Sequence, residues 1–329
     1  MLYKLILERS EEKNPVVDNW RFDCGFVDVE WTPFHAAARY GHLDMCLALM
    51  GNYSIIHPEA VNPANAKGLT PLHAAAAGGH LQVCNAILEK LRNHPSLLNP
   101  EYGSLTALHF AAEKGHMEVC EAILKVAPIK NPPDDIGNTP LHCAATRGHE
   151  KICRMIVYYI DDLNPCREDG WTPFERAAHE GHLLVCEVMM SVMKDKNPKS
   201  HYLKSGKWCT PLHIAADKGR LEVCNAIMNQ VQDKNPRDFD GWTPLHLAAL
   251  SGHSSVCEAI MKNIFNKNPS DNEGCTPLHS AAANGHIETF NVVAQIANVT
   301  DLNLADEEGW TPLHFAASKG QIQIVKATY

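Results

Sequence analysis

The chain has 329 residues, of which 45% are hydrophobic and 20% are charged, proportions that are ordinary for a folded protein. Its formal net charge of −9 argues against nucleic acid as a partner, because phosphate contacts need a basic surface. No apolar run approaches the roughly 20 residues of a membrane-spanning helix, and the apolar start at residues 1–9 is too short for a secretory signal. We therefore expect a cytoplasmic or nuclear chain that is neither secreted nor inserted directly in a membrane.

A tetrapeptide, Thr-Pro-Leu-His or a close variant of it, recurs nine times along the chain at intervals of 33 to 38 residues. Its copies begin at Thr32, Thr70, Thr106, Thr139, Thr172, Thr210, Thr243, Thr276 and Thr311. A motif at this period indicates a stack of similar units in which each unit packs on its neighbours. Such a chain presents a long surface and has no obvious enclosed pocket, so we expect no small-molecule substrate.

We expect the chain to begin and end inside a unit. Residues 5–15 have the pattern of the end of a second helix, as in residues 259–269, and nine residues follow the last Gly320. We therefore expect residues 1–26 to be a remnant of a preceding unit plus an irregular insertion. Residues 27–329 then form nine units, the last incomplete, and we expect the whole to be a segment of a longer array.

The seventh copy shows the elements of one unit in order. Thr243 is the expected N-cap of a first helix and Pro244 its first residue, where the missing N–H costs nothing. Gly252 ends this short helix, and a second helix with an apolar stripe at residues 256–261 follows. The repeated Asn-Pro, here at residues 268–269, is interpreted as the stop of the second helix, because proline disfavours helix at the residue before it.

This unit, with Thr-Pro-Leu-His-x-Ala-Ala followed by Gly-His, resembles the ankyrin repeat over residues 27–329. The resemblance implies a mainly α fold, a curved and elongated solenoid of helix–turn–helix units with projecting β-hairpin or turn fingers. It further implies that the fingers and the first helices line a concave groove. Two departures stand out: the fifth copy has Glu175 in place of histidine, and the sixth finger is five residues longer, with the extension at residues 199–206.

The 19 histidines and 12 cysteines suggest a metal site until they are placed in the repeat. Fifteen of the histidines fall in the Thr-Pro-Leu-His and Gly-His copies, where we expect turn and inter-repeat hydrogen bonds. Seven cysteines share one position of the second helix, which favours a reduced, apolar core residue: Cys46, Cys84, Cys120, Cys153, Cys186, Cys224 and Cys257. We therefore expect no metal and no cofactor.

Catalytic motifs are missing from the sequence: it contains no nucleophile elbow, no phosphate-binding glycine loop and no zinc-protease helix motif. We predict that the chain is not an enzyme.

Recognition is expected at positions that vary between the repeats. Tryptophans precede the repeat threonine at Trp31, Trp171, Trp242 and Trp310, where a finger tip is expected to be exposed, and aromatic residues often anchor interfaces. The alternative is that each tryptophan packs on a neighbouring finger and serves stability. The other candidates are Tyr40 on a first helix and the acidic finger residues Asp240, Glu273, Glu307 and Glu308, whereas Asp238, Asp271 and Asp306 occupy a repeated turn position and are expected to be structural.

The function predicted from these features is a protein–protein interaction scaffold or adaptor that binds a protein partner through its finger tips and concave groove. The acidic fingers favour a partner with basic or apolar side chains. The alternative is a regulatory ankyrin region of a larger enzyme or membrane channel. An enzyme in its own right is the third reading, and it would require a catalytic cluster that breaks the period.

Overall fold

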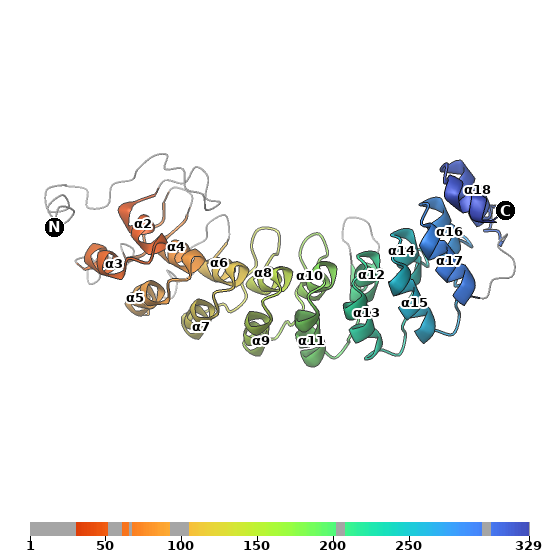
Figure 1. The fold of residues 1–329 in the computed structure, drawn as a ribbon. Coiled ribbons are helices and arrows are strands. Elements are labelled where there is room, and N and C mark those ends of the chain that lie inside the picture. Colours follow the sequence, from red (N-terminus) through yellow and green to blue (C-terminus); the bar gives the residue numbers. More distant parts are fainter. Residues whose placement is uncertain are drawn as a thin grey trace. The chain divides into compact units, whose positions relative to one another are not determined.

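The computed structural model describes residues 31–51, 61–65, 68–92, 105–201, 208–297 and 304–328 (Figure 1). The chain divides into two compact units, Met1–Asp162 and Leu163–Tyr329, and each is described by itself. The remnant expected at residues 1–26, and most of the finger extension expected at residues 199–206, lie outside the described residues.

Both units are mainly α, as the repeat pattern predicts. The first unit has inner helices α2 (Pro33–Arg39), α4 (Pro71–Gly78), α6 (Ala107–Lys114) and α8 (Pro140–Arg147), and outer helices α3 (Leu43–Met50), α5 (Leu81–Leu91), α7 (Met117–Val126) and α9 (Glu150–Tyr158). Within this unit each inner helix packs on the next inner helix and each outer helix on the next outer helix. Figure 1 shows the two rows, with the inner helices above the outer ones.

The second unit repeats this arrangement. Its inner helices are α10 (Pro173–Glu180), α12 (Pro211–Asp217), α14 (Pro244–Leu250), α16 (Pro277–Ala283) and α18 (Pro312–Ser318). Its outer helices are α11 (Leu183–Val192), α13 (Leu221–Met228), α15 (Ser254–Asn263), α17 (Ile287–Ile296) and α19 (Ile322–Thr328). In the sixth finger β1 (Ser200–His201) and β2 (Trp208–Cys209) pair antiparallel, with Ser200 opposite Cys209.

Each of the nine repeat threonines is the N-cap of an inner helix, as predicted. In repeat seven the N–H of Thr243 donates to Nδ1 of His246 at 3.2 Å, and the two side chains lie 2.9 Å apart. Because Nδ1 accepts, the proton of the neutral ring is on Nε2. Small alanines behind the cap, such as Ala248 and Ala249, are fully buried and let neighbouring helices approach closely.

The same histidine joins one repeat to the next. Nε2 of His246 donates to the carbonyl of Cys275, the last residue of the following finger, at 3.1 Å. The same bond recurs between His35 and Leu69, His73 and Leu105, His109 and Asn138, His213 and Trp242, and His279 and Trp310. The expected role in inter-repeat hydrogen bonding is confirmed.

The Gly-His copies make a second series of bonds between repeats. Nε2 of His253 donates to the carbonyl of Asp217 at 3.0 Å, from the end of the preceding inner helix. Where the motif has lost its histidine, Arg220 reaches the carbonyl of His179 at 2.9 Å and Gln321 that of Ala283 at 3.2 Å. The position therefore requires a side-chain N–H donor, which three residue types can supply.

The interpretation of Asn-Pro as a helix stop is wrong, because the outer helices end several residues earlier; α15, for example, ends at Asn263. The asparagine instead caps the next inner helix: Oδ1 of Asn235 accepts the N–H of Leu245 at 3.1 Å, and Asn131, Asn164 and Asn197 do the same for their repeats. In three repeats a lysine directly before the asparagine donates to carbonyls near the end of the outer helix, as Lys267 does at Met261. Lys130 with Asn131, and Lys196 with Asn197, thus close one helix and start the next.

The seven cysteines of the repeated position are fully buried in the outer-helix core, as predicted. None of the described cysteines is in a disulfide. Burial raises the pKa of the Cys46 thiol to about 11, so the thiol stays protonated and acts as a small apolar side chain.

Stability is expected to fall as the pH is lowered from about 7 to about 5. Burial lowers the pKa of His35, His213 and His246 from 6.5 to about 4, so in this window the unfolded chain takes up protons that the folded chain does not. Each such histidine contributes a loss of up to about 1.4 kcal/mol per pH unit. Burial raises the pKa of Glu175 to about 7, which works in the opposite direction but for a single group.

The measurement is urea unfolding at several pH values, followed by circular dichroism. A free energy of unfolding that is constant or rises toward about pH 5 would show that these rings are not held neutral.

Candidate functional site

Fingers seven, eight and nine of the second unit are built on an aspartate turn. In finger seven, the turn before Thr243, Oδ1 of Asp238 accepts the N–H groups of Asp240 at 3.0 Å and Trp242 at 2.7 Å. Asp271 and Asp306 bind their own fingers in the same way. The expected structural role of these three aspartates is confirmed.

Fingers seven, eight and nine, which precede Thr243, Thr276 and Thr311, are joined by backbone hydrogen bonds. The N–H of Asn272 donates to the carbonyl of Asp240 at 3.0 Å, and the N–H of Glu307 donates to that of Glu273 at 2.9 Å. The side-chain amide of Asn272 also donates to the backbone carbonyl of Phe239 at 3.0 Å. These bonds hold neighbouring finger tips in a defined register before any partner arrives.

An open groove of about 620 Å³, which we call the finger groove, lies between fingers seven and eight and helix α14. It is lined by Asp238, Phe239, Asp240, Trp242, Leu247, Asp271, Asn272 and Glu273. It brings together three residues predicted from the sequence, Trp242, Asp240 and Glu273. Phe239 was missed, although a phenylalanine within a polar turn was a usable signal, and its side chain is 64% exposed.

The tryptophans differ in exposure. Trp31 is only 4% exposed, so the expectation of an exposed finger tip is wrong at this position. Trp310 is 41% exposed and lies against His314 and Phe315. Trp242 is half-buried, with its ring centroid 5.8 Å from that of His246. The rings therefore pack within their own repeats and still present an edge or face outward in the second unit.

Trp171 of finger five contacts an arginine. The guanidinium carbon of Arg176 lies 4.4 Å from the centre of the Trp171 ring, and its nitrogen is 4.0 Å from a carboxylate oxygen of Asp169. The ring of His179 also contacts Trp171, edge-on, with the ring centroids 5.4 Å apart. This tryptophan is thus already occupied by a cation from its own repeat.

The remaining predicted residues are exposed but lie outside the finger groove. Glu307 and Glu308 are exposed on finger nine, and the backbone of Glu307 contacts finger eight. Tyr40, in the first unit, is 52% exposed at the end of α2. Of the predicted residues, Trp242, Asp240 and Glu273 therefore share the finger groove, and Glu307, Glu308 and Tyr40 do not line it.

Glu175, which replaces histidine in repeat five, is compensated by the sixth finger. Its carboxylate accepts the N–H of Thr172 at 3.0 Å, as the histidine ring would. It has no N–H for the next finger, and the hydroxyl of Ser200 on β1 donates to it instead. Ser200 also lies 3.5 Å from the carbonyl of Cys209. Ser200, which belongs to the sixth finger, thus makes the contact to position 175 that links the two repeats.

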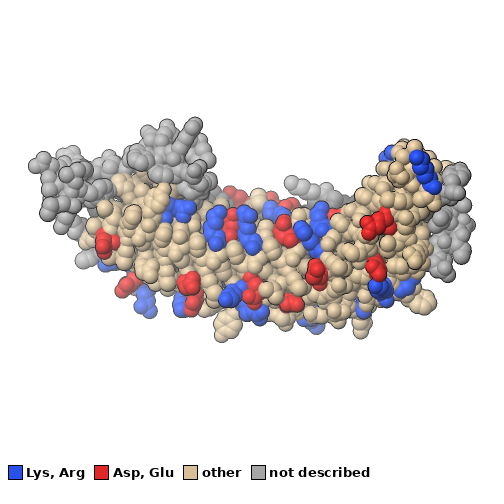
Figure 2. All heavy atoms as spheres, viewed as in Figure 1, with Lys and Arg blue, Asp and Glu red and all other residues tan. Residues whose placement is uncertain are grey.

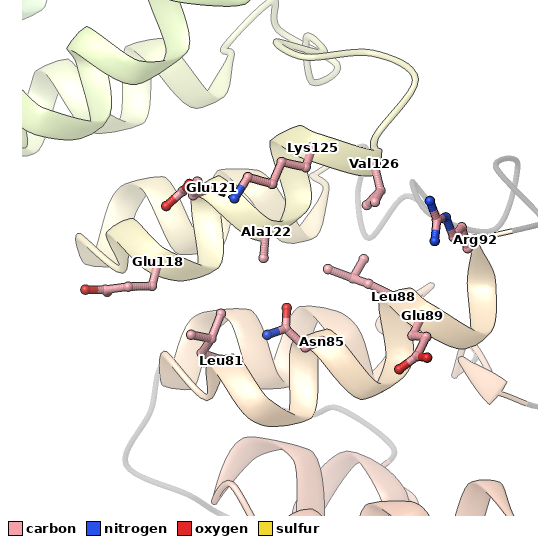
Figure 3. A pocket seen from close by; sticks show the side chains of 10 residues that line it. All are labelled: Leu81, Asn85, Leu88, Glu89, Arg92, Glu118, Glu121, Ala122, Lys125 and Val126. Carbon is pink, nitrogen blue, oxygen red and sulfur yellow. Dashed lines mark ion pairs between the residues drawn. The ribbon is translucent and has the colours of Figure 1, made fainter.

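A second groove of about 620 Å³ lies in the first unit between the outer helices α5 and α7 (Figure 3). Figure 3 shows Lys125 beside Glu121, and the two form an ion pair of 2.7 Å. Glu118, Glu89 and Arg92 also line it, so its charges are mixed. On the face drawn in Figure 2, acidic and basic side chains are likewise interspersed. The finger groove is the better candidate because it combines aromatic side chains with charged side chains that are all acidic.

A family model described as "Ankyrin repeats (3 copies)" matches the chain in overlapping segments at residues 3–99, 91–169, 108–200, 176–271, 212–302 and 258–327. The chain belongs to the ankyrin repeat family. The stacked helix pairs with capped inner helices are the structural form of that match. Among curated proteins the comparison returns no match.

Two further observations describe this ankyrin repeat chain. Among the residues that the structure describes, no group of three or more His, Cys, Asp or Glu side chains could hold a metal ion. None of the described helices is both long enough and apolar enough to cross a membrane.

Proposed function

We propose that this chain is a protein–protein interaction scaffold or adaptor, which holds a protein partner against its finger tips and inner helices, and that binding alone is its activity. Ankyrin repeats are generally protein–protein interaction modules. The finger groove is the observation that carries the proposal. It combines the exposed Phe239 with Trp242 and with acidic residues of fingers seven and eight, which are joined by hydrogen bonds. Rigid fingers lose little conformational freedom on binding, which favours affinity.

The domain boundaries are part of this proposal: nine repeats over residues 27–329. Their support is that all nine repeat threonines cap an inner helix. We also infer a cytoplasmic or nuclear location, which the free core thiols support because reducing compartments keep cysteines in that form.

The affinity for the partner is expected to fall when an aromatic side chain of the fingers is removed. Changing Phe239, Trp242 or Trp310 singly to alanine should weaken binding by about thirtyfold, since an aromatic anchor that a partner covers contributes about 2 kcal/mol. Affinity purification with quantitative mass spectrometry measures partner recovery. The charge reversals Glu307→Lys and Glu308→Lys should lower recovery further at low salt, where rim charges act most strongly.

The matched control is Phe265→Ala, which removes a fully exposed aromatic side chain outside the finger groove in the same unit. It should leave recovery unchanged, and urea unfolding should show that each variant is folded. Equal recovery with the control and with the finger variants would refute the proposed binding surface.

A further inference from the structure

The side chain at position 175 has to meet two hydrogen-bonding demands. In repeat seven the neutral ring of His246 accepts the N–H of Thr243 on Nδ1 and donates Nε2–H to the carbonyl of Cys275 in the next finger. A carboxylate can only accept, so an ionised Glu175 meets the first demand and fails the second. A protonated carboxyl group offers an acceptor oxygen and a donor O–H, and it therefore matches the histidine that it replaces.

The hydroxyl of Ser200 contacts both Glu175 and the carbonyl that a histidine would reach. It bonds Oε1 of Glu175 and lies 3.5 Å from the carbonyl of Cys209, the last residue of the sixth finger. A serine hydroxyl has one proton, so it donates fully to only one of these oxygens at a time. With Glu175 ionised, the carboxylate is the stronger acceptor and takes this proton. With Glu175 protonated, its O–H donates to Ser200 and frees the serine proton for the Cys209 carbonyl.

The surroundings of Glu175 place both of its protonation states within reach near neutral pH. Its side chain is fully buried, and burial raises its pKa to about 7, against the opposing effects of its bonds to Ser200 and the repeat threonine and of Arg176. Because this pKa lies above the ordinary 4.5, the protonated form favours the fold, and its contribution is lost as the pH rises toward about 7. Further along the same helix, the ring of His179 lies 2.9 Å from the Glu180 carboxylate.

The other elements packed on α10 bring few titratable groups to the site. Helix α12 carries His213, whose pKa burial lowers to about 4, and Asp217 at its end. On β2, burial and the charge of Glu175 raise the pKa of the Cys209 thiol. The one carboxylate of α11, Glu187, is exposed. His213 and the Cys209 thiol therefore stay neutral while Glu175 titrates.

We propose that Glu175 and Ser200 form a proton-controlled tie between helix α10 and the sixth finger. When Glu175 is protonated, two hydrogen bonds in series run from its O–H through Ser200 to the Cys209 carbonyl. They replace the single histidine bond by which repeats six to eight hold the next finger. When Glu175 ionises, Ser200 turns to the carboxylate and its bond to Cys209 is lost. The sixth finger is therefore held more firmly in mildly acidic than in mildly alkaline solution.

The carbonyl of Cys209 can be observed with an internal control. The sequence contains two cysteine–threonine peptide bonds, Cys209–Thr210 and Cys275–Thr276. Isotope labels in the cysteine carbonyl and the threonine amide therefore give two correlated signals in nuclear magnetic resonance spectra of the full chain. The Cys209 carbonyl signal should move with pH, with a midpoint at about 7. The Cys275 signal should stay in place, because its partner His246 has a pKa that burial lowers to about 4.

Two variants at position 175 identify the titrating group. Glu175→Gln cannot ionise, and Glu175→His restores the repeat pattern, so in both the Cys209 signal should no longer move over this range. A shift that persisted in Glu175→Gln would come from another group, such as His179, and would overturn the proposal. So would a Cys209 signal in the unchanged protein that does not respond to pH.

Ser200→Ala tests the relay itself. This variant keeps the carboxyl group of Glu175 and removes the hydroxyl, so the carboxyl carbon of Glu175 should still titrate while the Cys209 carbonyl signal stays fixed. A Cys209 shift as large as in the unchanged protein would mean that the charge of Glu175 acts through space, and it would overturn the tie. Circular dichroism checks that each variant is folded, and the two variants at position 175 decide by themselves if Ser200→Ala is not.

Discussion

Replacing His246 by alanine is expected to lower the free energy of unfolding by about 3 kcal/mol. The variant loses the bond to the carbonyl of Cys275, leaves the buried N–H of Thr243 without its acceptor and opens a cavity in a fully buried site. Urea unfolding gives the total loss. Amide hydrogen exchange should show the largest loss of protection in finger eight and helix α16, because stability in a repeat array is carried by neighbouring interfaces.

His314 is the matched control. It bonds the N-cap Thr311 through the same Nδ1 contacts, at 3.2 and 2.8 Å, but it is exposed, and among the described residues no finger accepts a bond from its Nε2. His314→Ala should therefore cost about 1 kcal/mol, the usual effect of losing a cap. Equal losses for the two variants would mean that the bond between repeats contributes nothing.

Gly219→Ala is expected to destabilise the second unit by about 3 kcal/mol. Gly219 has φ +67°, a left-handed conformation that costs an alanine about 1 to 2 kcal/mol. A Cβ there would also lie 2.6 Å from Nδ1 of His253, so this ring must move and give up its bond to the carbonyl of Asp217. Urea unfolding measures the loss.

Gly320→Ala separates the two contributions. Gly320 has φ +71° and no atom within 4 Å of the added Cβ, so this variant reports the backbone cost by itself. In a double-mutant cycle, Gly219→Ala combined with His253→Ala should lose less than the sum of the single changes, because the clash is then absent. Strict additivity would show that the histidine ring is not what the glycine accommodates.

Much of the fold could be predicted because each repeat carries its own local rules. Thr243-Pro244 starts a helix by capping chemistry, the buried stripe at residues 256–261 has helical spacing, and both were confirmed. The error came at Asn-Pro, where a local rule about proline suggested a helix stop. The asparagine side chain makes its bond ten residues later, to Leu245 in repeat seven, a contact that local reasoning does not reveal.

The candidate site was predicted in part. The repeat period identified Trp242, Asp240 and Glu273 as varying finger positions, and the structure lines one groove with them. The period could not say that Trp31 is buried, because exposure depends on what surrounds a position in space. It also could not show that Arg176 covers Trp171, a contact made by the packing of a finger on its inner helix.

The sequence by itself determined the unit, its period and its caps, because N-capping, helical spacing and turn chemistry depend on residues close together in the chain. The tertiary structure decided how the repeats are tied and which finger side chains share a groove. Those contacts join residues about one repeat apart, such as His246 with Cys275, or Asp240 with Asn272. Their geometry follows from the packing of one repeat on the next, which no single copy of the motif encodes.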